Sequence, residues 1–431
     1  MIDREEGGAG LAASLRGLGH DGRTLFALRT LRMFGYGFLA VILVLYLAAS
    51  GLDPLAIGIV LTLTLLGDTV VSLWLTTHAD RVGRRRVLVI GSGLVLLAGA
   101  VFAVTDQLPL LILAGVIGVI SPTGNEVGPF LAVEQAALTQ VVSDRRRTAT
   151  FAWYNLVGYV ATATGALTAG LVSQVLLSSG VSEVDAYRVV VAGYAVIGLA
   201  MAAVAWRLGP GIETAAPTGR TGRTEVTGPD DGIRRRLGLG RSRGVVLRLS
   251  ALFSLDAFAG GFIPQSLMAF WFHERFGVDP ATLGAIFFAA NLLAAVSSLS
   301  AARIAARIGL IQTMVFTHLP SYVLLLLVPL MPTLPLAVAV LLLRFSLSQM
   351  DVPTRQSYVM AVVDPDERSA AAGVTGIART VGASVSPSIS SVLIANASLA
   401  AIPFFLAGGL KIAYDLLLYR DFRSHRAPPE R

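Results

Sequence analysis

The sequence predicts an all-α integral membrane protein in which twelve transmembrane helices form two pseudo-symmetric six-helix bundles. Three observations predict this class: a composition poor in charge, twelve long apolar stretches, and a repeat that relates the two halves. Of the 431 residues, 54% are hydrophobic and only 14% are charged. Because a soluble domain is usually about a quarter charged, lipid is the natural solvent for so much apolar surface.

Each of the twelve apolar stretches is long enough to cross a bilayer, which takes about 20 helical residues. We predict spans over residues 26–49, 55–77, 86–104, 108–138, 149–177, 186–206, 245–272, 281–304, 310–331, 335–361, 368–395 and 399–420. A linker rich in Gly, Pro, Thr and charge, which cannot bury a core, separates the two sets of six. The predicted domains are a first tail at 1–25, a first six-helix bundle at 26–206, the linker at 207–244, a second six-helix bundle at 245–420 and a second tail at 421–431.

The two halves share a sequence repeat. Gly51-Leu-Asp53-Pro54 returns as Gly277-Val-Asp279-Pro280, and the same gapless register places Arg81 on Arg307 and Gly83 on Gly309. Asp-Pro is suited to open a helix, because aspartate caps the first turn and proline fits inside it. Two parallel repeats of six spans are one of the architectures found in transporters.

Charge in the loops predicts the orientation. One set of alternate loops is rich in arginine and the other is rich in acid, which is the positive-inside pattern. The arginine-rich loops contain Arg81, Arg84, Arg85, Arg86, Arg145, Arg146, Arg147, Arg303, Arg307 and Arg368. We therefore expect a multi-pass protein of the cell's cytoplasmic membrane with both termini in the cytoplasm. Residues 1–25 lack the apolar core of a signal peptide.

Composition also argues against several classes of function. The net charge of +7 lies in short loops between apolar spans, so a nucleic-acid partner is not expected. There is no cysteine and no phosphate-binding Gly-Lys-Ser/Thr loop, and the five histidines are scattered. We expect no catalytic residues, no metal and no cofactor, and a monomer embedded in lipid.

A short charged loop lies between the spans at 55–77 and 86–104. Its order Asp80-Arg81-x-Gly83-Arg84-Arg85 resembles the signature loop between helices 2 and 3 of the major facilitator superfamily of transporters. The family usually has glycine four residues before the aspartate, where this chain has Thr76, and the repeat copy at Arg307 and Gly309 lacks the aspartate.

This resemblance implies a secondary transporter that works by alternating access. It also implies a cytoplasmic gate, in which charged contacts of the loop form and break as the two halves rock. The residues that match the gate are Asp80, Arg81, Gly83, Arg84 and Arg85. The alternative is that these arginines only set the topology.

Charged and polar residues inside the spans are costly and mark candidate sites. The span at 108–138 contains Asn125 and Glu126, followed on the same helical face by Glu134. We expect Asn125 and Glu126 in a substrate or proton cavity and Glu134 at the cytoplasmic interface. The alternative is that both glutamates are solvated or pair with the arginines at 145–147.

The span at 335–361 contains Asp351 and Arg355, which are one turn apart and able to pair. Either a purely structural pair or a substrate site fits them. The other residues assigned to the cavity are Tyr36, Asp256, Gln265, Asn291 and Arg379. Arg379 could instead neutralise Asp256 or Asp351. Arg29 and Arg32 come early in the first predicted span, and we expect them to extend to the interface.

These expectations combine into a proton-coupled carrier of a small molecule. Burial raises the pKa of a carboxyl group towards physiological pH. Glu126 or Asp256 is the carboxylate that we expect to bind the proton. Export is favoured over import by analogy alone. The alternatives are a proton-coupled importer, a uniporter of a small metabolite, or a membrane sensor without transport.

Overall fold

The computed structural model describes residues 18–126, 128–142, 144–213, 240–364 and 367–422. All regular secondary structure in these residues is helical. The chain groups into two compact units: unit 1 is Met1–Ser50, Gly67–Pro217 and Asp279–Phe288, and unit 2 is Gly51–Leu66, Thr218–Val278 and Ala289–Arg431. Unit 1 is formed mainly by the first half of the sequence and unit 2 mainly by the second half. Residues 51–66 of the first half nevertheless group with unit 2, and residues 279–288 of the second half group with unit 1.

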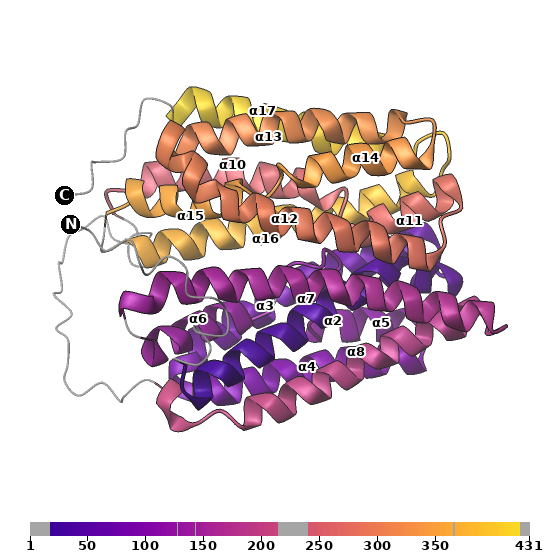
Figure 1. Ribbon diagram of the computed structural model, residues 1–431, viewed down its shortest axis with the longest axis horizontal. Helices are drawn as coiled ribbons and strands as arrows, with labels where there is room; N and C mark the ends of the chain where they lie inside the picture. The colour runs from indigo at the N-terminus through magenta and orange to yellow at the C-terminus, as the bar shows by residue number, and fades with distance from the viewer. Residues whose placement is uncertain (1–17, 127, 143, 214–239, 365–366, 423–431) are drawn as a thin grey trace. The chain divides into compact units, whose positions relative to one another are not determined.

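The helices of the first half of the chain follow the predicted spans (Figure 1). They are α2 (His20–Ala49), α3 (Pro54–Val82), α4 (Arg84–Val104), α5 (Leu108–Ile117), α6 (Phe130–Val141), α7 (Asp144–Ser178) and α8 (Glu183–Trp206), followed by the short η1 (Pro210–Ile212). The helix α2 begins earlier than the predicted residue 26. Most of the predicted tail and linker lies outside the described residues, at 1–17 and 214–239.

The helices of the second half of the chain also follow the predicted spans. They are α10 (Arg243–Gly261), α11 (Gln265–Phe276), α12 (Pro280–Ile308), α13 (Leu310–Leu327), η2 (Val328–Leu330), α14 (Leu334–Phe345), α15 (Asp351–Val362), α16 (Arg368–Ile394) and α17 (Ile402–Phe422). Of the predicted second tail, 423–431 lies outside the described residues.

Within the described residues, ten helical stretches are long and apolar enough to cross a membrane. Two further predicted spans are each divided between two shorter helices, α5 with α6 and α14 with α15. A third predicted span contains α10 and α11, which are separated at residues 262–264. The all-helical membrane fold is therefore confirmed, and three of the predicted spans are interrupted rather than continuous.

The internal repeat extends to backbone conformation and packing. Gly83 and Gly309 both have positive φ (100° and 93°) where the chain turns from one helix into the next. The Asp53 carboxylate accepts a hydrogen bond from the backbone N–H of Leu55 at 2.9 Å, and Asp279 accepts one from Thr282 at 3.0 Å, so both predicted caps form. The helix pairs α2 with α7 and α4 with α8 pack closely in the first half, as α10 with α16 and α13 with α17 do in the second.

Glycines allow the backbones of these helix pairs to approach closely. A Cβ atom on Gly37 of α2 would lie 2.0 Å from the carbonyl oxygen of Thr162 in α7, and one on Gly261 of α10 would lie 2.3 Å from that of Ala383 in α16. Small residues at such crossings are typical of membrane helices, whose association depends on close packing. The same device therefore holds the first and fifth spans of each half together.

Candidate functional site

The break between α5 and α6 positions the acidic residues of the fourth span. Residues 118–126, 128 and 129 are not helical, and Gly124 and Gly128 have positive φ (70° and 81°), which favours glycine over other residues. Glu126 lies in this segment and Glu134 lies in α6. The predicted continuous helix over 108–138 is thus wrong in its middle, because Pro122, Pro129 and these glycines interrupt it.

Two arginines of α2 pair with these glutamates inside unit 1. Arg29 forms an ion pair with Glu126. Nη1 of Arg32 lies 2.5 Å from Oε1 of Glu134, and its Nη2 lies 3.1 Å from Oε2 of Glu126. The Tyr154 hydroxyl of α7 donates a hydrogen bond to Glu134. We call these five side chains the unit 1 cluster.

Aromatic rings and backbone oxygens complete the surroundings of the two guanidinium groups. Arg29 Nε donates to the carbonyl oxygen of Tyr154 at 2.7 Å, and its guanidinium lies 4.3 Å from the centre of the Tyr154 ring. Arg32 lies 4.8 Å from the centre of the Phe130 ring. Charged, hydrogen-bonding and cation–π contacts together hold both arginines away from water.

The side chains of Arg29, Arg32 and Glu134, which were expected at the cytoplasmic interface, are buried inside unit 1. The exposed fractions are 4% for Arg29 and 0% for both Arg32 and Glu134. Each arginine is neutralised by a carboxylate from the fourth span, so it does not need to reach water. Glu134 pairs with Arg32, and the side chains at 145–147, the alternative partners, lie outside what the structure describes.

The other residues predicted for the cavity in this unit lie in different surroundings. Tyr36 is fully buried in α2, whereas Asn125 is exposed. Asp68 of α3 is also buried and accepts a hydrogen bond from the Ser72 hydroxyl at 3.3 Å. Glu126 itself is partly open, with 23% of its side chain exposed.

In unit 2, Asp256 of α10 is the meeting point of three cations. Its Oδ1 lies 2.5 Å from Nζ of Lys411 in α17, and its Oδ2 lies 3.2 Å from Nη1 of Arg379 in α16. Nη1 of Arg355 in α15 is 3.7 Å from the same Oδ2. The predicted proximity of Arg379 to Asp256 agrees with this geometry.

Asp351, the first residue of α15, extends these contacts to α13. Its Oδ2 lies 2.5 Å from Nη1 of Arg355, as the spacing of one turn predicts. Its Oδ1 lies 3.0 Å from Nε2 of His318, which is within ion-pair distance but lacks the alignment of a hydrogen bond. The Tyr322 hydroxyl is 2.9 Å from Nδ1 of His318 and 3.4 Å from Nζ of Lys411.

Six side chains thus form a closed ring, and two more attach to it. Asp415 of α17 attaches through His318, with 3.6 Å between its Oδ1 and Nδ1 of the histidine, and Arg379 attaches through Asp256. We call the whole set the unit 2 network: Asp256, His318, Tyr322, Asp351, Arg355, Arg379, Lys411 and Asp415. Arg379 is its most open member, with 32% of its side chain exposed.

The structure brings together Asp256, Asp351, Arg355 and Arg379, which were all predicted for the cavity. Gln265 and Asn291 form a separate buried pair at 3.3 Å. Sequence reasoning missed Lys411, His318, Tyr322 and Asp415. A signal for two of them exists, since Lys411 is the only lysine of the chain and lies in the middle of the last predicted span, one turn before Asp415.

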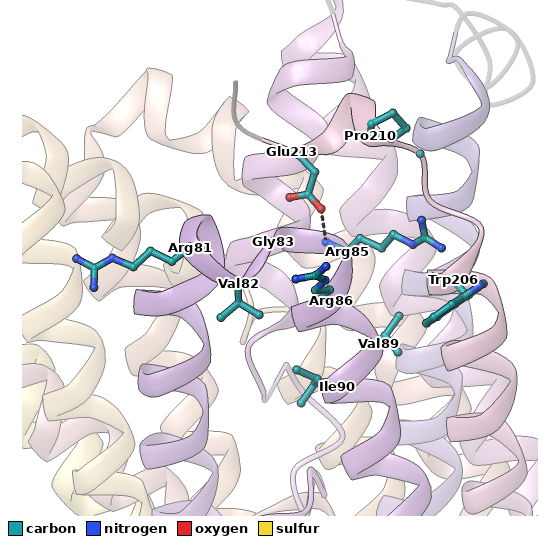
Figure 2. Close-up of a pocket in the computed structure, with 11 residues that line it drawn as sticks. Arg81, Val82, Gly83, Arg85, Arg86, Val89, Ile90, Trp206, Pro210 and Glu213 are labelled. Carbon is teal, nitrogen blue, oxygen red and sulfur yellow. Dashed lines mark hydrogen bonds between the residues drawn. The ribbon is translucent and has the colours of Figure 1, made fainter. Parts of the chain in front are cut away.

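The signature loop lies at the turn between α3 and α4 (Figure 2). Glu213, which follows η1, accepts hydrogen bonds from the backbone N–H of Arg84 at 2.7 Å and of Arg85 at 3.2 Å. The Arg84 side chain is buried and donates to the carbonyl oxygen of Ile212 at 3.2 Å. Of the predicted gate, the Asp80 side chain lies outside what the structure describes.

The remaining side chains of this loop border a hollow of about 760 Å³. Arg85 lies over the ring of Trp206 at 5.0 Å, and Arg81 points away from Arg85 and Arg86 in Figure 2. Arg81 and Arg86 are exposed. The loop therefore has one arginine tied into unit 1 and others that remain accessible.

Comparison with known proteins agrees with this architecture. The sequence profile of the Major Facilitator Superfamily matches residues 25–387 and, in a second match, residues 267–430. The uncharacterized membrane protein YJR124C of Saccharomyces cerevisiae is 30% identical over 419 residues, covering 92% of this chain and 93% of its own.

Solved structures of similar fold include two transporters. A bacterial homolog of the human lysosomal transporter Spinster, in an inward-facing and unoccupied conformation, has a TM-score of 0.71 at 15% identity and covers 95% of this chain and 98% of its own. A D-xylose–proton symporter has a TM-score of 0.68 at 15% identity, with coverage of 93% and 97%. The resemblance read from the signature loop is confirmed, and the chain belongs to the major facilitator superfamily of membrane transporters.

Proposed function

We propose that this protein is a proton-coupled secondary active transporter that moves a small molecule across the cytoplasmic membrane by alternating access. Membership of the family supports transport. The observation that carries the finer proposal is the concentration of buried charge in the unit 1 cluster and the unit 2 network. An ionised side chain at the bilayer centre costs about 2.5–3.5 kcal/mol even on a lenient scale. Charge buried at this cost serves either structural pairing or the binding of a polar cargo, and we propose the second role.

The proposed substrate is small and polar or charged. In unit 1, Tyr36, Asn125 and Glu126 are the proposed contacts, and Glu126 is the partly open carboxylate among them. In unit 2 the proposed contacts are Asp256, Gln265, Asn291, Asp351, Arg355 and Arg379. Partial exposure of Arg379 supports this choice. A substrate can reach a guanidinium that is open to water and can bind it in place of Asp256 or together with Asp256.

Proton coupling requires a group that gains and loses a proton during the cycle. Glu126 and Asp256 remain the first candidates. Each is held by cations, Glu126 by Arg29 and Arg32 and Asp256 by Lys411 and Arg379. A proton on either carboxylate would therefore have to displace an ion pair, which gives a reason to test each by neutralisation.

We propose that the signature loop gates the cytoplasmic side through Asp80, Arg81, Gly83, Arg84 and Arg85, with both termini in the cytoplasm and the protein acting as a monomer. The buried Arg84 anchors the loop, while the exposed Arg81 is free to exchange partners. Export is the proposed direction. An importer or a uniporter of a small metabolite is the alternative, as is a sensor that does not transport.

The experiment that tests this function measures proton flux in proteoliposomes under an imposed pH gradient. Pentoses, nucleosides, organic anions and lipophilic cations form the substrate panel. Wild type is compared with Glu126→Gln and Asp256→Asn, and exposed Glu183→Gln serves as the matched control.

Substrate-triggered proton flux that survives in Glu183→Gln and is lost in one of the other two variants supports a proton-coupled carrier and identifies a carboxylate that it needs. Substrate movement without any dependence on the proton gradient contradicts the coupling and supports a uniporter. Ligand binding without movement of substrate supports the sensor. Preloading the vesicles on either side distinguishes export from import.

A further inference from the structure

Asp415 is a buried carboxylate that the unit 2 network leaves without a hydrogen bond. Its exposed fraction is 0%, and neither of its oxygens has a hydrogen-bond partner among the described residues. Its nearest ionisable neighbour on another helix is His318, at 3.6 Å, and that side chain is only 2% exposed. Such an unsatisfied buried acceptor is costly unless a proton reaches it. We propose that the His318–Asp415 pair also takes up a proton during transport, beside the candidate carboxylates Glu126 and Asp256. This proposal rests on the proposed function.

The helices that pack most closely against α13 are α14, α15 and α17. On one side of His318, Asp351 of α15 faces Nε2, and on the other Tyr322 of α13 and Asp415 of α17 face Nδ1. The same helices carry further charged or titratable groups: Arg344 of α14, Arg355 of α15, and Lys411 and Tyr414 of α17. In the part of the chain that is described, no ion pair joins Arg344 to the network.

A neutral imidazole can satisfy only part of this arrangement. It has one N–H donor and one acceptor nitrogen. If Nδ1 accepts the Tyr322 hydroxyl proton, the N–H is on Nε2 and faces Asp351, and Asp415 receives nothing. When a proton is added to Nδ1, both nitrogens become donors, the Tyr322 hydroxyl changes from donor to acceptor, and the imidazolium lies 3.6 Å from Oδ1 of Asp415. Proton uptake thus gives His318 a charge opposite to that of Asp415, and the two groups titrate as a coupled pair.

The count of charges in the network supports the same site. Its three carboxylates, Asp256, Asp351 and Asp415, are balanced by Lys411, Arg355 and Arg379. With a neutral His318 the network has no net charge, and one proton makes it +1. Histidine is the side chain whose ordinary titration range spans pH 5 to 8, so among the members of the network we assign the change of one proton to His318.

Protonation of the pair also affects Arg355. Asp351 is shared between His318 and Arg355, at 3.0 Å and 2.5 Å. A positive imidazole attracts Asp351 and so weakens the ion pair between Asp351 and Arg355. The other carboxylate near Arg355 is Asp256, which already pairs with Lys411 and Arg379. More positive charge then becomes available beside Arg379, the open member of the network. A proton therefore favours binding of an anionic substrate and opposes binding of a cationic one, which makes anions symported and cations antiported.

The first test needs no substrate. Wild type with ¹³C-labelled histidine rings is placed in lipid nanodiscs, and the ring signals are followed by NMR from pH 5 to 9. His318→Gln identifies the signal of His318, and His20→Gln is the control for loss of an exposed ring. The expected result is a His318 signal that titrates in this range, with a midpoint that changes by about one pH unit in Asp415→Asn. A His318 signal that does not move with pH in folded protein overturns the proposal.

The second test uses a substrate found by the transport screen. The proposal predicts that a pH gradient drives at least tenfold less accumulation in His318→Gln, and that exchange measured with equal pH on both sides becomes independent of pH. Gradient-driven accumulation within twofold of wild type overturns the assignment. If wild type itself ignores the pH gradient, the coupled function fails instead, and the NMR titration shows separately whether the pair binds a proton.

Discussion

The unit 1 cluster and the unit 2 network both bury ion pairs beside an interrupted span, but they differ in chemistry. The unit 1 cluster pairs two arginines with two glutamates, and arginine stays protonated at any physiological pH. The unit 2 network adds a histidine, a lysine and a third carboxylate that lacks a hydrogen bond. Fixed charge of balanced sign suits a structural or substrate-binding role, whereas a titratable base suits coupling to protons. The comparison therefore favours a fixed role for the unit 1 cluster and supports the unit 2 network as the proposed site of proton uptake.

The largest expected effect comes from breaking the unit 1 cluster at Arg32. Its side chain is fully buried against Glu134 and Glu126, so Arg32→Gln leaves the buried Glu134 without its cation, while Glu126 keeps Arg29. Removing one partner of a buried pair typically costs about 3–5 kcal/mol. We expect a loss of that order in the free energy of unfolding, measured by denaturant titration in detergent.

Two further variants sharpen this prediction. Arg379→Gln in the unit 2 network should cost less, because its guanidinium is partly exposed and the carboxylate it leaves keeps Lys411. The double variant Arg32→Gln with Glu134→Gln should recover part of the loss. Equal costs for Arg32→Gln and Arg379→Gln would contradict the view that unit 1 carries the more rigid pairing.

The next effect tests what the two units share. Gly37→Ala and Gly261→Ala each place a methyl group against a backbone oxygen of the neighbouring helix, at 2.0 Å and 2.3 Å before any adjustment. Overpacking of this kind costs about 1–3 kcal/mol or more. We expect both variants to lower the Tm by several degrees and by similar amounts.

The matched controls are glycines with open space around the added atom. Gly93→Ala in α4 and Gly376→Ala in α16 meet nothing within 4 Å. These changes should be neutral or slightly stabilising, because alanine favours the helix. If Gly37→Ala is tolerated while Gly261→Ala is not, the two halves do not use the same packing.

The sequence predicted features that depend on neighbouring residues better than contacts between residues that are distant in sequence. The Asp53 and Asp279 caps and most of the spans follow from local composition, and the structure agrees, apart from the three interrupted spans. Most of the predicted linker lies outside the described residues. Arg29 and Arg32 lie farther along their helix than predicted, because the first span was started at 26, whereas α2 begins at His20.

Partners distant in sequence were beyond the reach of local patterns. The pair of Asp351 with Arg355 is visible as a spacing of one turn, but the meeting of Arg29 with Glu126, or of Asp256 with Lys411, depends on which helices pack together. The interruptions of the fourth and tenth spans were also hidden, since Gly and Pro within an apolar stretch predict a bend as readily as a break.

A smaller effect separates the two units through their tyrosines. The Tyr154 hydroxyl binds Glu134 and the Tyr322 hydroxyl binds His318, so each Tyr→Phe change removes one buried hydrogen bond. Each should cost about 1 kcal/mol of stability. Of these two variants, only Tyr322→Phe should change the pH profile of substrate-driven proton flux. The reason is that Tyr322 contacts His318, the base that we propose to titrate, whereas Tyr154 contacts Glu134. An altered profile in Tyr154→Phe would move the coupling site to unit 1.

The smallest effect concerns carboxylates outside the spans, where the two units again look alike. Glu367 accepts hydrogen bonds from the backbone N–H of Gly240, Arg241 and Ser242 at 2.6, 3.0 and 3.0 Å, just before α10. Burial acts to raise the pKa of Glu367, but these hydrogen bonds outweigh it and hold the pKa below its ordinary value. Glu213 makes two such bonds at the start of α4.

A lowered pKa in the folded state means that the carboxylate stabilises the fold at neutral pH, and that this contribution is lost as the pH falls through the lowered pKa. Glu367→Ala should therefore cost about 0.5–2 kcal/mol at pH 7, as for other lost caps. Its unfolding free energy should converge with that of wild type on acidification towards pH 3. With fewer N–H donors to lose, Glu213→Ala should cost less at pH 7. A cost of Glu367→Ala that is constant over this pH range would show that the side chain acts by packing rather than by its charge.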